Sequence, residues 1–401
     1  MICISVKDTC HVSDRGGGAQ IRRRARCRRI AVRWADGKKA PGLKTRAIGS
    51  TLTEPKEYDV GLWTTLKFAA QAKPLLMLAM DRSLRGLFRS GFVSTLLAEG
   101  LHEPMLQGPA NLDRLRDALG PEVDREGLRR WLDVGVRLGE LRRGEGETYS
   151  LAGSLARNLA SPAADAHAAY FRARVEVFHD YVVGTPARLR GGERFPLDPA
   201  HGELFARSSR TVEPLLNRIV EREFPLVGAV RLLEVGCGSG VYVRRACELN
   251  PELRAVGLEL TEEVASHARA NLSAWGFADR ARIETCDVRR YRSDEPFDVV
   301  TFFNLIYYFP VAERTPVLRH LASLLAPGGS LVLTTFCRGT DLANATFDLW
   351  ATMTEGGGAL PTRTELLKAV EEAGFVHVRH ASLLPGYFLV TAHKAEVAPA
   401  S

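Results

Sequence analysis

The sequence predicts an α/β protein in which a doubly wound parallel sheet follows a separate helical domain. From residue 230 onward, short apolar segments that suit buried strands alternate with segments in which apolar residues recur at helical spacing. The first strand, residues 230–235, runs directly into a turn with three alternate glycines that opens a helix. Between residues 58 and 183, apolar residues recur mainly at helical spacing. The 401-residue chain therefore divides into a helical domain and an α/β domain.

The first 50 residues are strongly basic, with 13 Lys/Arg and 3 Asp/Glu. The rest of the chain holds 41 basic and 44 acidic residues, so the net charge of +7 is no argument that the whole chain binds nucleic acid. We predict that residues 1–55 form a disordered basic tail. Three explanations of the tail stay open: a start codon placed too far upstream, a segment that touches nucleic acid or anionic surfaces, or an organelle transit peptide.

Residues 56–184 are predicted to form a helical domain. Apolar spacing over residues 58–101 predicts two or three helices broken near Pro74 and Asp81. These helices are so apolar that we expect their surfaces to be buried against the second domain or against another copy of the chain. Asn111 and Asp124 are predicted to cap two helices, and a hairpin follows at residues 140–151. Helix, helix, hairpin is the winged-helix arrangement, which serves DNA binding or dimerisation. Residues 111–151 hold eight Arg, no Lys and nine Asp/Glu, which favours dimerisation.

A helix over residues 163–183 is followed by a segment rich in Gly, Pro and Arg up to Asp198, and by another helix over residues 203–223. We assign residues 185–228 as linker and helix. In residues 229–396 the pattern predicts strands at 230–235, 254–260, 282–288, 297–304 and 331–336, helices at 262–272, 312–325 and 364–373, and a closing antiparallel hairpin at 376–383 and 387–393.

The glycine turn selects among ligands. A dinucleotide-binding fingerprint would need glycine or alanine at position 241, which is Val241 here. The phosphate-binding loop pattern is absent. Polar residues end neighbouring strands: Glu234, Glu259, Asp287 and Asn304. Because the carboxyl ends of parallel strands meet at one edge, these side chains should converge there, and Glu259 can accept both hydroxyls of a ribose. For each residue taken alone, the alternative interpretation is a polar side chain at a strand end that binds no ligand.

The stretch E-x-G-x-G-x-G at residues 234–240 resembles motif I of the class I S-adenosylmethionine (SAM) methyltransferases, and the closing hairpin is similar to the end of their Rossmann-like, seven-stranded sheet. The preceding winged-helix domain resembles that of the small-molecule O-methyltransferases of plants and bacteria. The resemblance covers roughly residues 60–395. It implies SAM as cofactor, a SAM-binding domain at 229–396, and a homodimer formed through the N-terminal helices.

The resemblance also assigns roles to individual positions. Gly236, Gly238 and Gly240 would let the main chain approach SAM, and Glu259 with the adjacent Leu260 would bind its ribose. Asp287 would accept from the adenine amino group, with the backbone of Val288 beside the ring. Asn304 would lie along the methionine part of SAM, and Glu234 would act near its amine.

One position departs from the O-methyltransferase pattern. Those enzymes carry a His-Asp-Trp run after the fourth strand, whose histidine is the general base, and Tyr307 stands at that position here. A free tyrosine with a pKa of about 10 is a poor base near pH 7. Another residue would then serve, with His179, His201 and His320 as candidates, or the acceptor needs no base. Tyr307 could instead orient the acceptor, face the sulfonium with its ring, or only wall the pocket.

We therefore expect a SAM-dependent methyltransferase (EC 2.1.1.-) acting on a small molecule, with O-methylation favoured, in secondary metabolism. The alternatives are a SAM-binding, DNA-binding regulator, or an N- or C-methyltransferase on the same fold. Seven cysteines form no C-x-x-C pair, which suggests reduced thiols in a cytoplasmic protein without a metal site. No apolar run reaches the roughly 18 residues of a membrane span. Acceptor walls are expected from residues 160–210 and 338–360, including Phe347, Trp350 and Met353.

Overall fold

A computed structural model of the chain describes residues 61, 63–64, 67, 71 and 73–396. The chain divides into two units, residues 1–68 and 69–401. In the first unit, Lys67 Nζ lies 5.2 Å from the centre of the Trp63 ring. The predicted disordered tail, residues 1–55, lies outside the described residues. Within the described residues, no helix combines the length and apolar character needed to cross a bilayer.

The second unit contains the predicted sheet. Its seven strands have the order β6-β5-β4-β7-β8-β10-β9, with β4, β5, β6, β7 and β8 parallel and β10 antiparallel to both β8 and β9. The bounds are β4 Arg231–Val235, β5 Arg254–Glu259, β6 Ala281–Thr285, β7 Phe297–Phe303, β8 Leu325–Phe336, β9 Phe375–Leu384 and β10 Tyr387–Lys394. The predicted fold class and the closing hairpin are thus confirmed.

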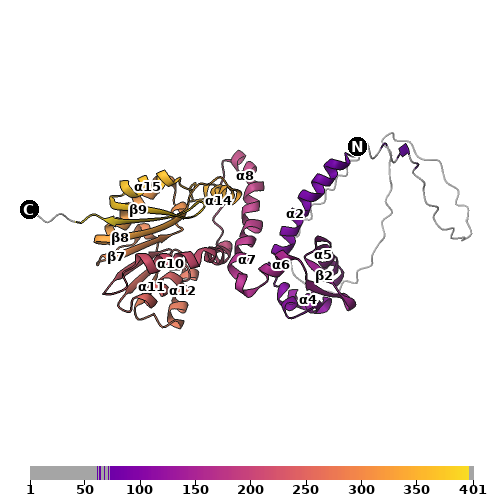
Figure 1. Ribbon diagram of the computed structural model, residues 1–401, viewed down its shortest axis with the longest axis horizontal. Coiled ribbons are helices and arrows are strands. Elements are labelled where there is room, and N and C mark those ends of the chain that lie inside the picture. The colour runs from indigo at the N-terminus through magenta and orange to yellow at the C-terminus, as the bar shows by residue number, and fades with distance from the viewer. Residues whose placement is uncertain (1–60, 62, 65–66, 68–70, 72, 397–401) are drawn as a thin grey trace, which may run out of the picture. The chain divides into compact units, whose positions relative to one another are not determined.

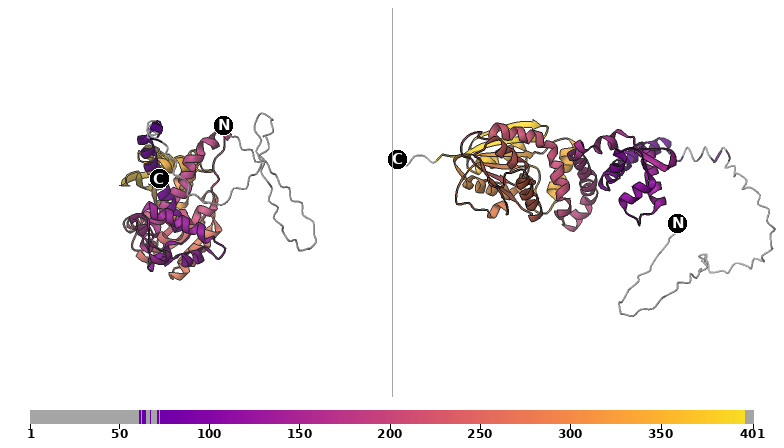
Figure 2. Two further views of the ribbon diagram at one scale, coloured as in Figure 1. Left: turned by 90° about the vertical axis from the view of Figure 1, so that its right-hand side faces the viewer. Right: turned by 90° about the horizontal axis from the view of Figure 1, so that it is seen from below.

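Helices cover both faces of this sheet (Figure 1). Helices α10 (Glu213–Glu223), α11 (Val241–Leu249) and α12 (Glu262–Ala274) pack on one face around Leu232 and Val299. Helices α13 (Val311–Leu324) and α15 (Arg363–Glu372) pack on the other around Leu233 and Val300. The two views of Figure 2 show the same layers from other directions. Residues alternate between these two apolar layers along each central strand, as burial on both faces requires.

Three elements of the α/β domain differ from the sequence prediction. Strand β6 ends at Thr285, so Asp287 does not end the strand but caps a 3₁₀ turn, Val288–Arg290, by accepting from the Arg289 amide. Strand β8 begins at Leu325 and includes the Pro-Gly-Gly stretch that was expected to close the preceding helix. Helix α14 (Leu342–Met353), capped by Asp341, was not predicted as a helix.

The N-terminal part of this unit follows the predicted order of elements. Asn111 and Asp124 cap α4 (Leu112–Leu119) and α5 (Arg125–Leu138) through bonds from the amides of Arg114 and Gly127. Strands β2 (Leu141–Arg143) and β3 (Thr148–Leu151) form the hairpin, joined by β1 (Ala110–Asn111). The short helices α3 (His102–Leu106) and α6 (Ser154–Leu159) complete this region. The predicted break near Asp81 is wrong, because α2 (Pro74–Ala98) runs through it as one helix with Asp81 exposed.

The connection between the two regions is more helical than predicted. Helix α7 (Asp165–Arg172) continues through a π-helical turn (Ala173–Phe178) into α8 (His179–Gly191), past Gly184 and Pro186. Tyr181 stacks on Phe195 at 4.0 Å, so tertiary packing overrides the local turn signal. The second predicted helix, residues 203–223, divides into α9 (Gly202–Ser209), a 3₁₀ turn (Arg210–Val212) and α10, and another 3₁₀ turn (Pro199–His201) precedes it.

Candidate cofactor site

The glycine turn lies where β4 meets α11, and all three glycines have positive φ: +65° at Gly236, +53° at Gly238 and +80° at Gly240. A side chain at Gly236 would collide with Leu305, whose Cδ atoms lie 2.7 Å from the position of such a Cβ. At Gly238 nothing lies within 4 Å of that position. The backbone at Gly238 is therefore open to a ligand, whereas Gly236 is needed for packing against the segment after β7.

Glu259, at the end of β5, contacts this turn directly. Its Oε2 accepts from the Gly238 amide at 3.1 Å, and its Oε1 accepts from the Leu260 amide at 2.8 Å. The Cys237 amide donates to the Leu258 carbonyl at 2.9 Å. The half-buried carboxylate is thus held beside the glycine turn, where hydroxyl groups of a ligand could share its remaining lone pairs. The Leu260 side chain is exposed.

Asp287 stands two residues after the end of β6, and the amide of Cys286 before it donates to the Glu259 carbonyl at 2.9 Å. Its carboxylate binds the Arg289 guanidinium, with Oδ2 2.6 Å from an Arg289 Nη. This hydrogen bond lowers the pKa of Asp287. Val288 is buried directly behind it. The carboxylate that was expected to meet an adenine amino group already has a cationic partner, so an adenine contact would compete with Arg289.

Glu234, on β4, is a buried carboxyl group next to the turn. Burial raises its pKa to about 8, against a lowering effect from a backbone hydrogen bond of Val243, and the charge of Glu259 raises it further. Its Oε2 has no hydrogen-bond partner among the described residues. A buried acceptor without a partner costs about 1–3 kcal/mol, more when charged. This cost would be relieved by a ligand that brings N–H donors.

Asn304, directly after β7, is a second such acceptor. It is one of four non-glycine residues with positive φ in the described part of the chain, at +57°. Its amide donates to the Thr334 carbonyl at 2.8 Å, and its side-chain Oδ1 is buried without a partner among the described residues. Backbone strain and an unpartnered polar atom in one residue indicate a binding position.

These two acceptors fit one kind of group. Strands β4 and β7 are neighbours, with Glu234 paired to Thr301 and Val235 to Phe302, so Asn304 follows on beside the glycine turn. Both unpartnered atoms are oxygens that accept hydrogen bonds, and a primary ammonium supplies three donors and one positive charge. The residues present thus fit a ligand with a sugar near Glu259 and an ammonium near Glu234 and Asn304. No group of three metal-ligating side chains occurs in the part of the chain that the structure describes.

Tyr307 lies in an aromatic cluster beyond Asn304. Its ring centre is 4.8 Å from that of Phe347 and 6.4 Å from that of Trp350, both on α14. Trp350 also contacts Phe178 at 5.8 Å and Phe205 at 5.2 Å. Burial raises the pKa of Tyr307 well above its ordinary value, so its phenol stays protonated at neutral pH. The deprotonated form that a general base requires is therefore disfavoured.

The three candidate histidines lie apart from one another. His320 contacts the Tyr291 carbonyl at 3.1 Å, and burial lowers its pKa. His179 is exposed at the start of α8. His201 is half-buried, with its Nδ1 4.0 Å from an Asp198 carboxylate oxygen and its ring 6.3 Å from Phe205. The structure thus brings only His201 to the margin of the aromatic cluster.

Sequence reasoning missed two side chains around this site. Leu305 packs on Gly236. Tyr387, on β10, is fully buried and donates to Thr334 Oγ1 at 3.0 Å. Neither belongs to a local motif, and only the fold reveals which residues they meet.

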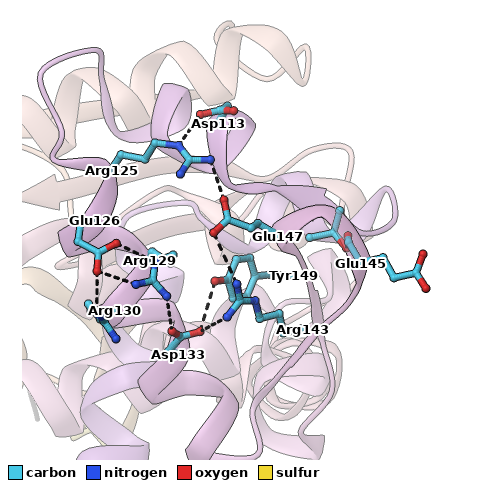
Figure 3. Close-up of polar contacts among 11 residues, drawn as sticks. Asp113, Arg125, Glu126, Arg129, Arg130, Asp133, Arg143, Glu145, Glu147 and Tyr149 are labelled. Atoms are coloured by element: carbon cyan, nitrogen blue, oxygen red, sulfur yellow. Dashed lines mark hydrogen bonds and ion pairs between the residues drawn. The ribbon is translucent and has the colours of Figure 1, made fainter. Parts of the chain in front are cut away.

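Three of the four arginines on α5, the second helix of the predicted winged helix, are paired with carboxylates. Figure 3 shows that the labelled arginines of α5 and β2 contact carboxylates of the same region. The pairs are Arg125 with Asp113 and Glu147, Arg129 with Glu126 and Asp133, Arg130 with Glu126, and Arg143 with Asp133 and Glu147. Phosphate binding would have to break these pairs, which disfavours DNA binding by this face.

Comparison with known proteins agrees with this geometry. Residues 233–331, from β4 into β8, match the model of a family described as "Methyltransferase domain". The matched segment includes the glycine turn, Glu259, Asp287 and Asn304. The chain thus contains a class I SAM-dependent methyltransferase domain.

Among curated proteins, it is 26% identical over 204 residues to demethylspheroidene O-methyltransferase of Rhodobacter capsulatus, covering 50% of this chain and 48% of that protein. The chain thus spans about half the length of the curated relatives it matches.

Solved structures extend the likeness to the N-terminal region. The mitomycin 7-O-methyltransferase MmcR has a TM-score of 0.67 at 20% identity, over 81% of this chain and 100% of that one. Human N-acetylserotonin methyltransferase, in complex with SAM, has a TM-score of 0.62 at 15% identity, over 80% of this chain and 98% of that one. At these identities the likeness establishes the fold, in which a helical region precedes the methyltransferase sheet.

The open position at Gly238 yields a first prediction. Gly238→Val should weaken binding of S-adenosylhomocysteine by roughly 100-fold or more, because the new side chain would occupy the space that a ligand needs. Isothermal titration measures the affinity. The matched control is Gly276→Val, since Gly276 also has positive φ (+78°) and open space around it but lies after α12. Unchanged affinity in Gly238→Val, or an equal loss in both variants, would contradict this placement of the ligand.

The buried carboxyl of Glu234 yields a second prediction. Its pKa is higher in the folded than in the unfolded protein, so the folded state binds more protons between about pH 4.5 and 8, and stability falls as the pH rises through that window. The Glu234→Gln variant has no titrating group at this position, so its stability without ligand should not fall for this reason. The free energy of unfolding of the variant minus that of wild type should therefore increase steadily from pH 5 to pH 8 in urea titrations. The exposed control, Glu252→Gln, should show no such trend; a flat difference for Glu234→Gln would refute the raised pKa.

Proposed function

We propose that this protein is a SAM-dependent methyltransferase that transfers a methyl group to an oxygen atom of a small molecule, in secondary metabolism. The observation that supports this most is the glycine turn, open at Gly238, with the Glu259 carboxylate bound to it and two unpartnered acceptors, on Glu234 and Asn304, beside it. The names of the similar proteins, several of them O-methyltransferases, support oxygen as the methylated atom.

Bound SAM supplies an electrophilic methyl group on its sulfonium. The residues of this chain would hold the sugar at Glu259 and the ammonium at Glu234 and Asn304, and keep the acceptor in line with the methyl group. Alignment of this kind can lower a barrier by about 7–11 kcal/mol. In this proposal the rings around Tyr307 exclude water and orient the acceptor, and no tyrosine acts as a base.

The acceptor that this site favours is large and apolar or aromatic apart from the reacting group. The rings that surround Tyr307 come from the segment after β7, from α14, from the π-helical turn and from α9. A cavity of about 1020 Å³ borders the same segment at Pro310 and is also lined by Arg188 and Arg194, but none of the rings around Tyr307 lines it.

Methylation of nitrogen or carbon on the same fold is the second candidate. It is favoured by one observation, the tyrosine in place of a histidine base, because a neutral amine can be methylated before it loses a proton. A DNA-binding regulator is disfavoured by the ion-paired face of α5 (Figure 3).

The direct test is incubation with methyl-labelled SAM and separate panels of phenols, amines and activated carbon acids, followed by extraction of labelled product and assignment of the methylated atom by NMR. We expect label in phenolic or other hydroxyl acceptors. Label found only in amines or carbon acids would contradict O-methylation and support methylation of nitrogen or carbon instead. Failure of the folded protein to bind SAM would overturn the whole proposal.

The role of Tyr307 yields a third prediction. Because burial disfavours its phenolate, Tyr307→Phe should lower kcat for a hydroxyl acceptor by less than about tenfold, and the pH dependence of kcat should keep its shape. Loss of a general base typically costs 10²–10⁴ in rate. A loss in that range, or loss of a rise of kcat with increasing pH that wild type shows, would instead identify Tyr307 as the base.

We also propose that the protein is a homodimer formed through α2, and that it works in the cytoplasm. Helix α2 presents eight large apolar side chains that are between 42% and 82% exposed: Leu75, Leu76, Met77, Leu78, Met80, Leu84, Leu87 and Phe88. At roughly half exposure, eight such side chains offer on the order of 800 Å², which is the area that one partner contributes to a standard interface. A second copy would cover this surface with an equivalent one, as two-fold symmetry requires.

A fourth prediction tests the homodimer. Wild-type protein should sediment at twice the chain mass, and Leu78→Glu/Leu84→Glu should sediment at the mass of one chain, because two charges would be buried in the interface. The control Leu342→Glu changes an exposed leucine on α14 and should remain dimeric. A monomeric wild type, or a dimeric double variant, would contradict an interface at α2.

A further inference from the structure

A second cavity, of about 610 Å³, lies outside the cofactor site and is lined by α2, α5, the π-helical turn and the start of α8. Phe88 and Phe92 of α2 and Trp131 of α5 give it an aromatic wall. Among the lining residues that the structure describes, Arg174 is the single arginine or lysine, and none is an acid. We call it the Arg174 cavity. Its volume is within the range of small-molecule sites, roughly 300–1,000 Å³.

Two glycines in the interior of α2 leave space in this cavity. Gly86 and Gly91 both line it, and a Cβ at either position would meet nothing within 4 Å. Glycine inside a helix is less favourable than alanine by about 1 kcal/mol, so both positions lower the stability of α2. A Cβ at Gly135 of α5 would instead collide with the ring of Phe92, which packs on Trp131 at 4.4 Å. Small residues therefore shape the aromatic wall and keep the space beside it open.

Arg174 is a partly buried cation without a carboxylate partner. Its Nη1 donates to the Ala343 carbonyl at 2.8 Å and to the Thr346 hydroxyl at 2.7 Å, both on α14. Its guanidinium carbon lies 4.8 Å from the ring centre of Tyr170 and 4.4 Å from that of Phe178. It forms no ion pair with any residue that the structure describes. Because buried charges are normally paired, this cation indicates a binding position for an anion.

The acid of the same π-helical turn, Glu176, is bound by other partners. Its Oε1 accepts from Arg172 Nε at 2.9 Å and from the hydroxyl of the buried Ser94 on α2 at 2.8 Å. Its Oε2 accepts from Arg172 at 3.1 Å. These bonds tie the turn to α2 and so fix the position of Arg174 at the cavity. Turns of this kind within α-helices occur frequently at functional sites.

We propose that the Arg174 cavity binds an aromatic carboxylic acid, with the carboxylate on the Arg174 guanidinium and the ring against Phe88, Phe92 and Trp131. The ring would remove apolar surface from water, and the carboxylate would supply the missing counter-charge through two parallel hydrogen bonds. The cavity includes none of the residues assigned to the cofactor, so this site goes beyond the proposed function.

Phe178 separates this cavity from the aromatic cluster of the proposed acceptor site. Its ring lies 4.4 Å from the Arg174 guanidinium carbon and 5.9 Å from the ring of Phe347, which contacts Tyr307. The acid is either the methyl acceptor itself, anchored at Arg174 with its hydroxyl group beyond Phe178, or a separate ligand held within the cavity. The two sources share one chemistry, and methyl transfer distinguishes them.

The first experiment tests the charge with two probes that share one ring, naphthalene-2-carboxylate and naphthalene-2-carboxamide. In isothermal titration of the full-length protein, wild type should bind the carboxylate about tenfold more tightly than the carboxamide, as a charge-assisted contact predicts. Arg174→Gln should remove this preference. The matched control is Arg172→Gln, which removes a charge from the same helix and should keep the preference, because Arg172 is paired with Glu176.

A second variant tests the location. The leucine side chain of Gly91→Leu would occupy the cavity, so both probes should bind roughly tenfold more weakly or worse. The control Ala98→Leu adds the same side chain at an exposed position of α2 and should leave both affinities unchanged. The affinity for S-adenosylhomocysteine should be unchanged in every variant, which shows that each is folded. Wild type that fails to bind S-adenosylhomocysteine would contradict the proposed function and leave the result for the two probes valid.

Methyl-labelled SAM and 3-hydroxy-2-naphthoate identify the source of the acid. Transfer, in which the hydroxyl oxygen gains the methyl group and loses its proton to solvent, makes the acid the acceptor if KM rises more than kcat falls in Arg174→Gln. Binding without transfer makes it a separate ligand, and both results support the site. The proposal is overturned if wild type binds no naphthalene-2-carboxylate, as when a second copy fills the cavity. A preference that is absent in wild type, or that persists in Arg174→Gln, overturns it as well.

Discussion

The candidate site depends on one physical constraint: two oxygen atoms, Glu234 Oε2 and Asn304 Oδ1, are buried without a hydrogen-bond partner at one edge of the sheet. Each such atom costs about 1–3 kcal/mol in the ligand-free protein. Because the fold retains both oxygen atoms at neighbouring strand ends, it is suited to bind a cationic hydrogen-bond donor. Such a ligand would give both oxygens a donor and would also favour the ionised form of the Glu234 carboxyl.

The strand order explains why these atoms meet. Strand β4 lies between β5 and β7, so the chain leaves β4 with partners on both sides and the order reverses there. Ligands of open α/β sheets bind at such a switch point. The glycine turn follows β4 directly, Glu259 ends β5 on one side, and Asn304 follows β7 on the other. The positive φ of Asn304 and the contact between Leu305 and Gly236 show how closely the two chain segments approach.

Local signals in the sequence were enough to predict the seven-stranded sheet, the glycine turn and the position of Glu259, because each depends on a strand and the residues that follow it. The pairing of Asp287 with Arg289 was not predictable, since strand-end spacing says nothing about which cation a carboxylate will meet. The contact of Tyr387 with Thr334 was hidden for a different reason: it joins β10 to β8, and nothing local to either residue reveals that these strands are neighbours. Pro186 suggested a turn, yet the stacking of Tyr181 on Phe195 holds the helix through it.

A crystal structure with S-adenosylhomocysteine tests the central claim most directly. The account predicts that the amino nitrogen of the ligand lies within hydrogen-bonding distance of both Asn304 Oδ1 and a Glu234 carboxylate oxygen, with the ribose hydroxyls at Glu259. A ligand bound away from the glycine turn, or one bound there while both oxygens remain without a donor, would contradict it.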